Sequence, residues 1–166
     1  MKNEKGFSLI ELLIVVAIIG IIAAIAIPNL LKSRQAANEA AGLSAVRTIG
    51  TAHATYQSTR GLGRDFAADL DALKVEGSVD SVLGSGTKSG YAFTTTGVAA
   101  VSTAPSYFNT NGDPLKDGTF GTGNRDFYSN ETYVIFQEPS AANGGGGPIA
   151  VPAFPTRIPA TGTPLE

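Results

Sequence analysis

Residues 6–29 read GFSLIELLIVVAIIGIIAAIAIPN, and the architecture of the whole chain follows from them. From Phe7 to Ile27 the only charged residue is Glu11. These 21 residues would form an α-helix about 31 Å long at ~1.5 Å per residue. A hydrocarbon core is ~30 Å thick, so the segment predicts one membrane-spanning helix, and no second apolar run approaches the ~20 residues that another crossing needs.

The composition of the chain argues against several classes of function. The 166 residues suggest one domain, and charged residues are 16% of them, below the usual ~25%. The net charge is −2 without a basic tract, so no nucleic-acid partner is expected. The chain has no Cys and a single His, His53, which excludes thiol catalysis, disulfides and multi-His metal centres. Without a catalytic constellation, the sequence predicts no enzyme and no cofactor.

The residues alone leave three interpretations of the apolar segment open. It can be a secretory signal peptide, because Ala24 and Ala26 satisfy the A-x-A cleavage rule. It can be a simple membrane anchor, or an anchor that also serves in assembly. A carboxylate such as Glu11 costs roughly 2.5–3.5 kcal/mol at the centre of a bilayer, which marks it as functional, unless it lies near enough to the helix end to snorkel.

Residues 6–11, together with the apolar run at 12–29, resemble the leader junction of type IV pilins and of the pseudopilins of type II secretion systems. The resemblance covers about the first 55 residues strongly. It implies that residues 1–6 are a leader peptide, cut between Gly6 and Phe7 by a prepilin peptidase that then methylates the new Phe7 amine. It also implies that Glu11 neutralises the Phe7 ammonium of a neighbouring subunit or of its own chain.

The same resemblance makes residues 7–28 both a transmembrane and an assembly helix. Gly20 and Pro28 are its weak points, because glycine lowers helix propensity and proline removes a backbone donor. The resemblance implies that the helix stretches between them when it leaves lipid for a filament. The implied partners are further copies in a helical homopolymer, inner-membrane lipid before assembly, the peptidase, an assembly ATPase with platform proteins, and minor pilins or pseudopilins.

Beyond Pro28 the pattern predicts an α+β, pilin-like fold. Apolar residues recur every three or four positions and predict an amphipathic continuation of the helix over 29–60, ended by the glycines at 61 and 63. Residues 61–138 should form a small head, in which that helix packs on an antiparallel sheet of three or four strands. The Gly/Pro-rich tail at 139–166 should be flexible or draped over the surface. The predicted elements of the head are a helix at 65–74 with Asp65 as its N-cap, and strands at 91–96, 98–107, 126–129 and 132–137.

One polar loop and one histidine are further candidate sites. Asn109, Asn111, Asp113 and Asp117 offer oxygen ligands at a spacing that can bind Ca²⁺. Ordinary turn chemistry is the favoured explanation, because the EF-hand order is absent. The Trp-containing calcium loop of major pseudopilins also cannot exist in a chain without Trp. His53 lies on the apolar face of the long helix and is predicted to be a core or interface residue.

The expected function is that of a structural subunit of a type IV pilus-like filament. The precursor would cross the inner membrane once, with its C-terminal domain outside the cytoplasm and the filament at the cell surface or in the periplasm. A pseudopilin of a type II secretion system is the alternative. The missing Cys pair counts against well-known adhesive pilins, and the missing calcium loop counts equally against major pseudopilins. An extracytoplasmic binding domain on a signal anchor is a further alternative, which predicts cleavage after Ala26 and no polymer.

Overall fold

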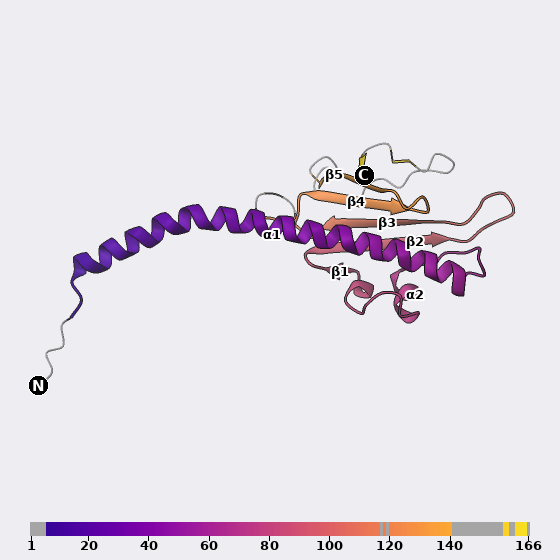
Figure 1. Ribbon diagram of the computed structural model, residues 1–166, viewed down its shortest axis with the longest axis horizontal. Helices are drawn as coiled ribbons and strands as arrows, with labels where there is room; N and C mark the ends of the chain where they lie inside the picture. The colour runs from indigo at the N-terminus through magenta and orange to yellow at the C-terminus, as the bar shows by residue number, and fades with distance from the viewer. Residues whose placement is uncertain (1–5, 117, 119, 141–157, 160–161, 166) are drawn as a thin grey trace, which may run out of the picture.

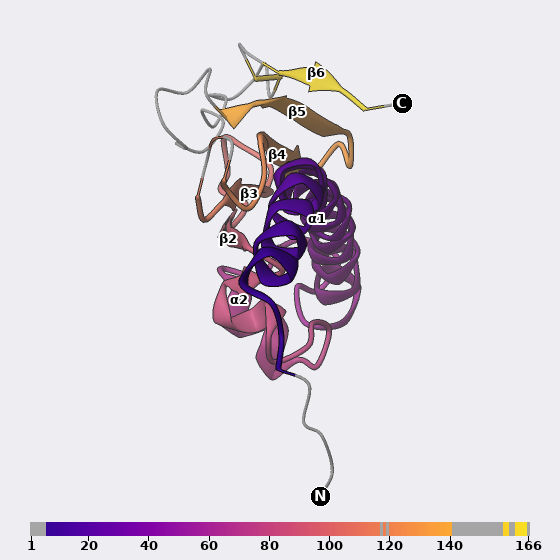
Figure 2. The same ribbon diagram turned by 90° about the vertical axis from the view of Figure 1, so that its left-hand side faces the viewer.

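The computed structural model describes residues 6–116, 118, 120–140, 158–159 and 162–165. One long helix, α1 (Leu9–Thr59), lies against one face of a six-stranded antiparallel sheet, and its first half projects beyond the head (Figure 1). In Figure 2 a short helix, α2 (Leu70–Val75), lies near the β2 side of the sheet, and β5 and β6 form the opposite side. This arrangement confirms the predicted α+β fold.

The helix α1 runs unbroken for 51 residues, as the sequence predicted. Only its second half contacts the head, since its buried residues lie between Gln35 and His53. Pro28 lies inside the helix and does not end it. The helix ends where Gly61 donates its N–H to Tyr56 O at 2.9 Å. A Cβ at Gly61 would stand 1.9 Å from Asp65 O, so the turn needs glycine.

The sheet follows the order of the chain, and every neighbouring pair of strands is antiparallel. It has six strands where the sequence predicted three or four. Two of the six contain only two residues each, and such short strands leave no periodic signal. The strands are β1 (Thr87–Lys88), β2 (Tyr91–Val98), β3 (Tyr107–Pro114), β4 (Arg125–Asn130), β5 (Ile135–Pro139) and β6 (Thr163–Pro164), and a 3₁₀ turn, η1 (Leu83–Ser85), precedes β1.

The predicted strand at 98–107 is wrong. The connection there is a loop closed by a bridge between Val101 and Ala104, and the strand β3 begins only at Tyr107. The residues of β3 were assigned to a polar loop because Asn, Gly and Asp favour turns. Pairing with β2 on one side and β4 on the other overrides that local preference.

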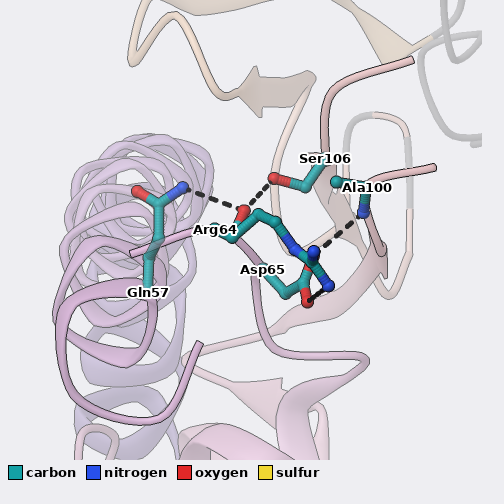
Figure 3. Close-up of polar contacts among 5 residues, drawn as sticks. All are labelled: Gln57, Arg64, Asp65, Ala100 and Ser106. Carbon is teal, nitrogen blue, oxygen red and sulfur yellow. Dashed lines mark hydrogen bonds and ion pairs between the residues drawn. The ribbon is translucent and has the colours of Figure 1, made fainter. Parts of the chain in front are cut away.

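Hydrogen bonds tie the loop after α1 to the loop between β2 and β3 (Figure 3). Arg64 O accepts from Gln57 Nε2 at 3.4 Å and from the hydroxyl of Ser106. Asp65 Oδ1 accepts from the backbone N–H of Ala100 at 2.9 Å, and this bond holds the pKa of the Asp65 carboxyl below its usual range. Asp65 is therefore not the N-cap that the sequence suggested.

The helix α2 starts five residues later than expected. It covers Leu70–Val75, and its N-cap is Asp69, which accepts from Ala72 N at 2.8 Å. Strand β5 likewise begins at Ile135, because residues 131–134 make the turn that follows β4.

The tail at 139–166 was expected to be flexible or draped over the surface. Residues 141–157, 160–161 and 166 lie outside the described part of the chain. Near the end of the tail, the described residues join the sheet, because Thr163 and Pro164 pair with β5 and Leu165 donates its N–H to Ile135 O at 2.8 Å. Leu165 also packs on the hydrophobic core.

The main core fills the space between α1 and the sheet. Tyr91 is fully buried and donates its hydroxyl to Arg125 O at 2.9 Å. A Cβ on Gly123 would stand 2.2 Å from that hydroxyl oxygen, so the loop before β4 needs glycine there. The side chains of this core include Val46, Ile49, Leu73, Leu83, Tyr91, Phe93 and Phe127.

His53 is buried in the head, as predicted, and is held in its neutral form. Its ring stacks on Phe108 with 4.2 Å between centroids, and its Nε2 lies 2.8 Å from Thr95 Oγ1. The Thr95 hydroxyl also lies 2.9 Å from Asn109 O and 2.8 Å from Thr110 Oγ1. Nδ1 of His53 has no hydrogen-bond partner among the described residues. Burial lowers the pKa of His53 from 6.5 to about 4.

We expect this histidine to make the head acid-sensitive. Between pH 6.5 and about 4, His53 is protonated in the unfolded chain and neutral in the folded chain. The free energy of unfolding therefore falls as the pH falls through this window. The loss from His53 amounts to roughly 3 kcal/mol. Denaturant unfolding of the full chain in detergent micelles, followed by tyrosine fluorescence at several pH values, measures it.

The control is His53→Gln, which keeps a side-chain amide donor for Thr95 and cannot titrate. Carboxylates also titrate near pH 4. The quantity to compare is therefore the difference between the unfolding free energies of the wild-type and His53→Gln chains at each pH. The same pH dependence in both would show that His53 does not cause it.

Candidate assembly surface

The first half of α1 is an apolar surface that the rest of the chain leaves uncovered. The large apolar side chains that are exposed between Phe7 and Leu30 range from 47% exposure at Val15 to 88% at Phe7. Among the described residues, α1 is the one helix that is long and apolar enough to cross a membrane by length and composition. The head closes its own core without this surface, which is therefore free to face lipid or other protein.

The described residues ahead of the helix place the predicted cleavage site in extended chain. Gly6, Phe7 and Ser8 precede the first residue of α1, and Ser8 has φ −75° and ψ 142°. All three are exposed, and no heavy atom lies within 4 Å of a Cβ built on Gly6. A protease that binds extended backbone can reach the bond between Gly6 and Phe7 without unwinding α1.

Glu11 lies in the first turn of α1. The partial positive charge of a helix N-terminus favours a carboxylate there by about 0.3–1 kcal/mol. Its side chain is exposed and makes no ion pair or hydrogen bond with any residue that the structure describes. The carboxylate is thus available to a cation that the isolated chain does not supply.

Gly20 and Pro28, the predicted weak points, both lie within the continuous helix. No heavy atom outside the local helix lies within 4 Å of a Cβ built on Gly20, so this side of the helix is open to close approach by another chain. The exposed half of α1 curves away from the direction of the packed half (Figure 1). Proline inside a helix is a known cause of such bending.

Three polar side chains fasten α1 to the loop between β3 and β4, where the helix leaves the head. Gln35 Nε2 donates to Gly118 O at 2.8 Å and to Gly121 O at 3.2 Å. Asn38 Nδ2 donates to Thr122 O at 2.9 Å. We call Gln35, Asn38 and Glu39 the exit clamp.

Glu39 gives the exit clamp its charge. Its Oε1 accepts from Asn124 N at 2.9 Å, and its Oε2 lies 2.8 Å from Arg125 Nε. Arg125 also donates to Gln137 Oε1 at 2.7 Å, so the clamp extends across β4 to β5. Gln35 and Glu39 are only 6% and 8% exposed, and buried polar groups of this kind are costly to leave without partners.

The exit clamp was not predicted from the sequence, because the apolar pattern that predicts the amphipathic helix over 29–60 does not include the polar residues Gln35 and Glu39. The buried positions Gln35, Glu39, Gly42, Val46, Ile49 and His53 in fact form one stripe at alternating spacings of four and three. Continuing the apolar spacing toward the N-terminus would have placed both polar residues on the packed face.

The candidate calcium ligands do not form a loop. Asn109, Asn111 and Asp113 alternate along β3, and Asp117 lies outside the described residues. Phe108 stacks on His53, so the even-numbered side chains of β3 face α1 and these three face the other side of the sheet. Within the described part of the chain, no three acidic or histidine side chains are grouped so that they could hold a metal ion.

Comparison with known proteins shows what the amino-terminal segment is similar to. Residues 1–27 match the family described as the prokaryotic N-terminal methylation motif. The chain is 67% identical over 39 residues to the type IV wide pilus major component PilA4 of Thermus thermophilus, which is 24% of this chain and 30% of that protein. It is 42% identical over 68 residues to the type IV major pilin protein PilA of Myxococcus xanthus, or 41% of this chain and 31% of that protein.

A fimbrial protein of Pseudomonas aeruginosa is 79% identical over 29 residues, which is 18% of this chain and 19% of that protein. The matched part spans less than a third of the length of these curated relatives. No solved structure gave a significant match. These matches support the resemblance seen in residues 6–29: the amino-terminal segment carries the N-terminal methylation motif, and the chain is similar to type IV pilins.

We expect Glu39→Ala to destabilise the head by about 1–3 kcal/mol, because it removes the acceptor of two bonds at a largely buried site. The half-exposed Arg125 keeps the loss below that of a fully buried pair. Urea unfolding of the full chain in micelles measures it. Asp71→Ala is the matched control, since Asp71 is exposed on α2 and should change stability by less than about 0.5 kcal/mol. Equal effects of the two substitutions would contradict the role given to the clamp.

Proposed function

We propose that this chain is a structural subunit of a helical, type IV pilus-like filament, made as a membrane-anchored prepilin. The observation that carries the proposal is the uncovered apolar half of α1, which holds a single carboxylate and projects from a head that is complete without it. The similarity to type IV pilins, and the N-terminal methylation motif matched at residues 1–27, support the same role. A structural subunit needs no catalytic site.

The apolar half of α1 needs two different environments in turn. In the precursor it spans the inner membrane, with the head outside the cytoplasm. In the filament it packs against the helices of other copies. Small residues at Gly20, Ala23, Ala24 and Ala26 allow helices to approach closely, which is how helices associate without a hydrophobic gain over lipid.

Processing supplies the cation that Glu11 lacks. Cleavage after Gly6 by a prepilin peptidase creates an ammonium group at Phe7, and methylation modifies this group. Glu11 of one subunit then pairs with the Phe7 ammonium of its neighbour. Because Phe7 precedes Glu11 by four residues, such a pair shifts neighbouring helices along their axes. The pair sets the register that an apolar bundle alone would leave loosely specified.

Gly20 and Pro28 bound the part of α1 that we expect to stretch when the helix leaves lipid. Both residues weaken helical hydrogen bonding. The exit clamp begins seven residues beyond Pro28, so the head stays attached to helix while that part extends. Export and polymerisation are assigned to a separate assembly ATPase and platform proteins, with minor pilins as further partners. The pilus is preferred to a secretion pseudopilus because the relatives are named as pilus and fimbrial proteins.

The first test is the intact mass and amino-terminal sequence of the mature protein. We expect a chain that begins at Phe7 and is heavier by one methyl group, about 14 Da. A chain that begins at Ile27 would instead support a secreted binding domain released after Ala26. A chain that still carries Met1 would contradict prepilin processing.

We further expect Glu11→Ala to be processed normally and to assemble poorly. Without its carboxylate the neighbour's ammonium is buried unpaired, which costs about 3 kcal/mol or more and weakens each contact about 100-fold. The amount of this protein in the sheared filament fraction is measured relative to its total amount in the cells, and the mature amino terminus is sequenced in parallel. Asp71→Ala serves as the control for loss of one carboxylate at an exposed site. Normal filament yield from Glu11→Ala would remove the pairing from the proposal.

A further inference from the structure

A groove of about 460 Å³ runs beside α1 on the side of the β4–β5 turn. The helix lines it with Val46 and Gly50. The sheet and the chain beside it line it with Ser129, Tyr133, Val134, Ile135 and Leu165. Arg47 and Thr51 lie along its edge on the helix. Tyr133 and Val134 are 47% and 38% exposed. The groove is thus a mainly apolar surface that the folded head leaves open.

The part of the groove lined by Tyr133 is held in place by a strained turn. Tyr133 has φ +59°, a left-handed conformation that is rare for a bulky residue. Its N–H donates to Asn130 O at 2.8 Å, and Asn130 Oδ1 accepts from the N–H and the hydroxyl of Thr132. The ring packs on Phe108 with 5.8 Å between centroids. Strain of this kind persists when the surroundings fix it, and it is concentrated at functional sites.

We propose that this groove receives the apolar half of α1 from a second copy of the chain, which lies parallel to α1 and is shifted along it. The inference rests on the proposed filament and adds a specific contact surface to it. The groove lies 16 residues or more beyond Leu30, so the apolar half of the same continuous helix cannot reach it. The apolar helix that we place in the groove therefore belongs to another copy.

The chemistry of the groove matches the apolar helix better than other occupants. Among the residues that the structure describes, the lining contains no carboxylate side chain and one charged side chain, Arg47. The span from Leu12 to Leu31 is uncharged, and most of its large side chains are exposed. An apolar helix laid in an apolar groove is a common mode of recognition, with anchors spaced by three or four residues.

The length and direction of α1 determine how far the second copy must be shifted along the helix axis. The groove wall is α1 itself, so a neighbouring helix that follows α1 from its exposed half reaches the groove without changing direction. A copy shifted by about 40 Å along the helix axis brings Ile19, in the middle of the apolar span, level with Val46. Each head would then pack on the span of a copy further along the filament.

The chain has no cysteine, which makes disulfide crosslinking a direct test. Val134→Cys is combined in turn with Ile14→Cys, Ile18→Cys, Ile22→Cys and Ile25→Cys, and purified filaments are oxidised. A disulfide forms only when the two Cα atoms lie within about 7 Å. We expect covalent multimers from positions on one face of the span, at least about tenfold more than from single-cysteine chains.

Val82→Cys is the matched control, because Val82 is more exposed than Val134, at 55%, and lies just before η1, outside the groove. Filaments that form but give no multimers from any Val134 pair would overturn the inference and leave the proposed function standing. So would equal multimers from the Val82 pairs. A wild-type chain that forms no filaments would overturn the proposed function and this inference with it.

Thr51→Cys, on the helix edge of the groove, takes the place of Val134→Cys if that variant does not assemble. The rate at which maleimide labels the thiol of the Val134→Cys chain distinguishes a second copy from the same chain or bound detergent as the occupant of the groove. We expect fast labelling in detergent-solubilised monomer and labelling slowed about tenfold or more in filaments, as burial of the site requires. A thiol that is already protected in the monomer would assign the groove to the same chain or to bound detergent and would overturn the inference.

Discussion

The uncovered apolar half of α1 is the constraint on which the rest of the molecule depends. A row of exposed Leu, Ile and Val side chains has no stable place in water, since burying each one is worth about 1.5–3 kcal/mol. Lipid and a bundle of similar helices both shield these side chains from water. The hydrophobic gain from moving the helix from lipid into such a bundle is small. The apolar surface therefore keeps the subunit in one of two environments without choosing between them. Under the proposed function, the choice falls to Glu11, the one charged group on that surface.

The head is built so that the free half of α1 does not disturb it. The buried residues of α1 begin at Gln35, several residues after the apolar run ends. At that point the helix is held by hydrogen bonds from Gln35, Asn38 and Glu39, whose direction matters, more than by apolar contact. Directional bonds fix the rotation of a helix about its own axis, whereas apolar packing tolerates small slips. The face that α1 presents beyond the head is thereby set by the head.

The long helix of this fold is the feature that the sequence predicts best. The helix α1 was expected with nearly its observed ends, because its apolar periodicity is long and Gly61 marks its stop. Strand β3 was missed, since Asn109, Asn111 and Gly112 favour turns and only pairing on both sides makes them a strand. Asp65 was taken for an N-cap because its alternative partner, Ala100 N, lies 35 residues away. A single sequence carries no signal for such a contact. The exit clamp was missed because its contacts are also distant in sequence: the partners of Gln35 and Glu39 lie more than 80 residues away.

Two groups of polar contacts lie at opposite ends of the packed half of α1 and connect it to the loops of the head. At one end Gln35 and Glu39 hold the loop before β4. At the other, Gln57 shares the carbonyl of Arg64 with Ser106 (Figure 3). Between them the buried residues of α1 are apolar except His53, which lies 2.8 Å from Thr95 Oγ1 and whose burial favours the neutral ring. Apolar burial supplies most of the stability along this part of the helix, but it does not define an axial position. The directional hydrogen bonds at the two ends do define that position, so under the proposed function they are the contacts that hold the head at a fixed place along α1 in the filament.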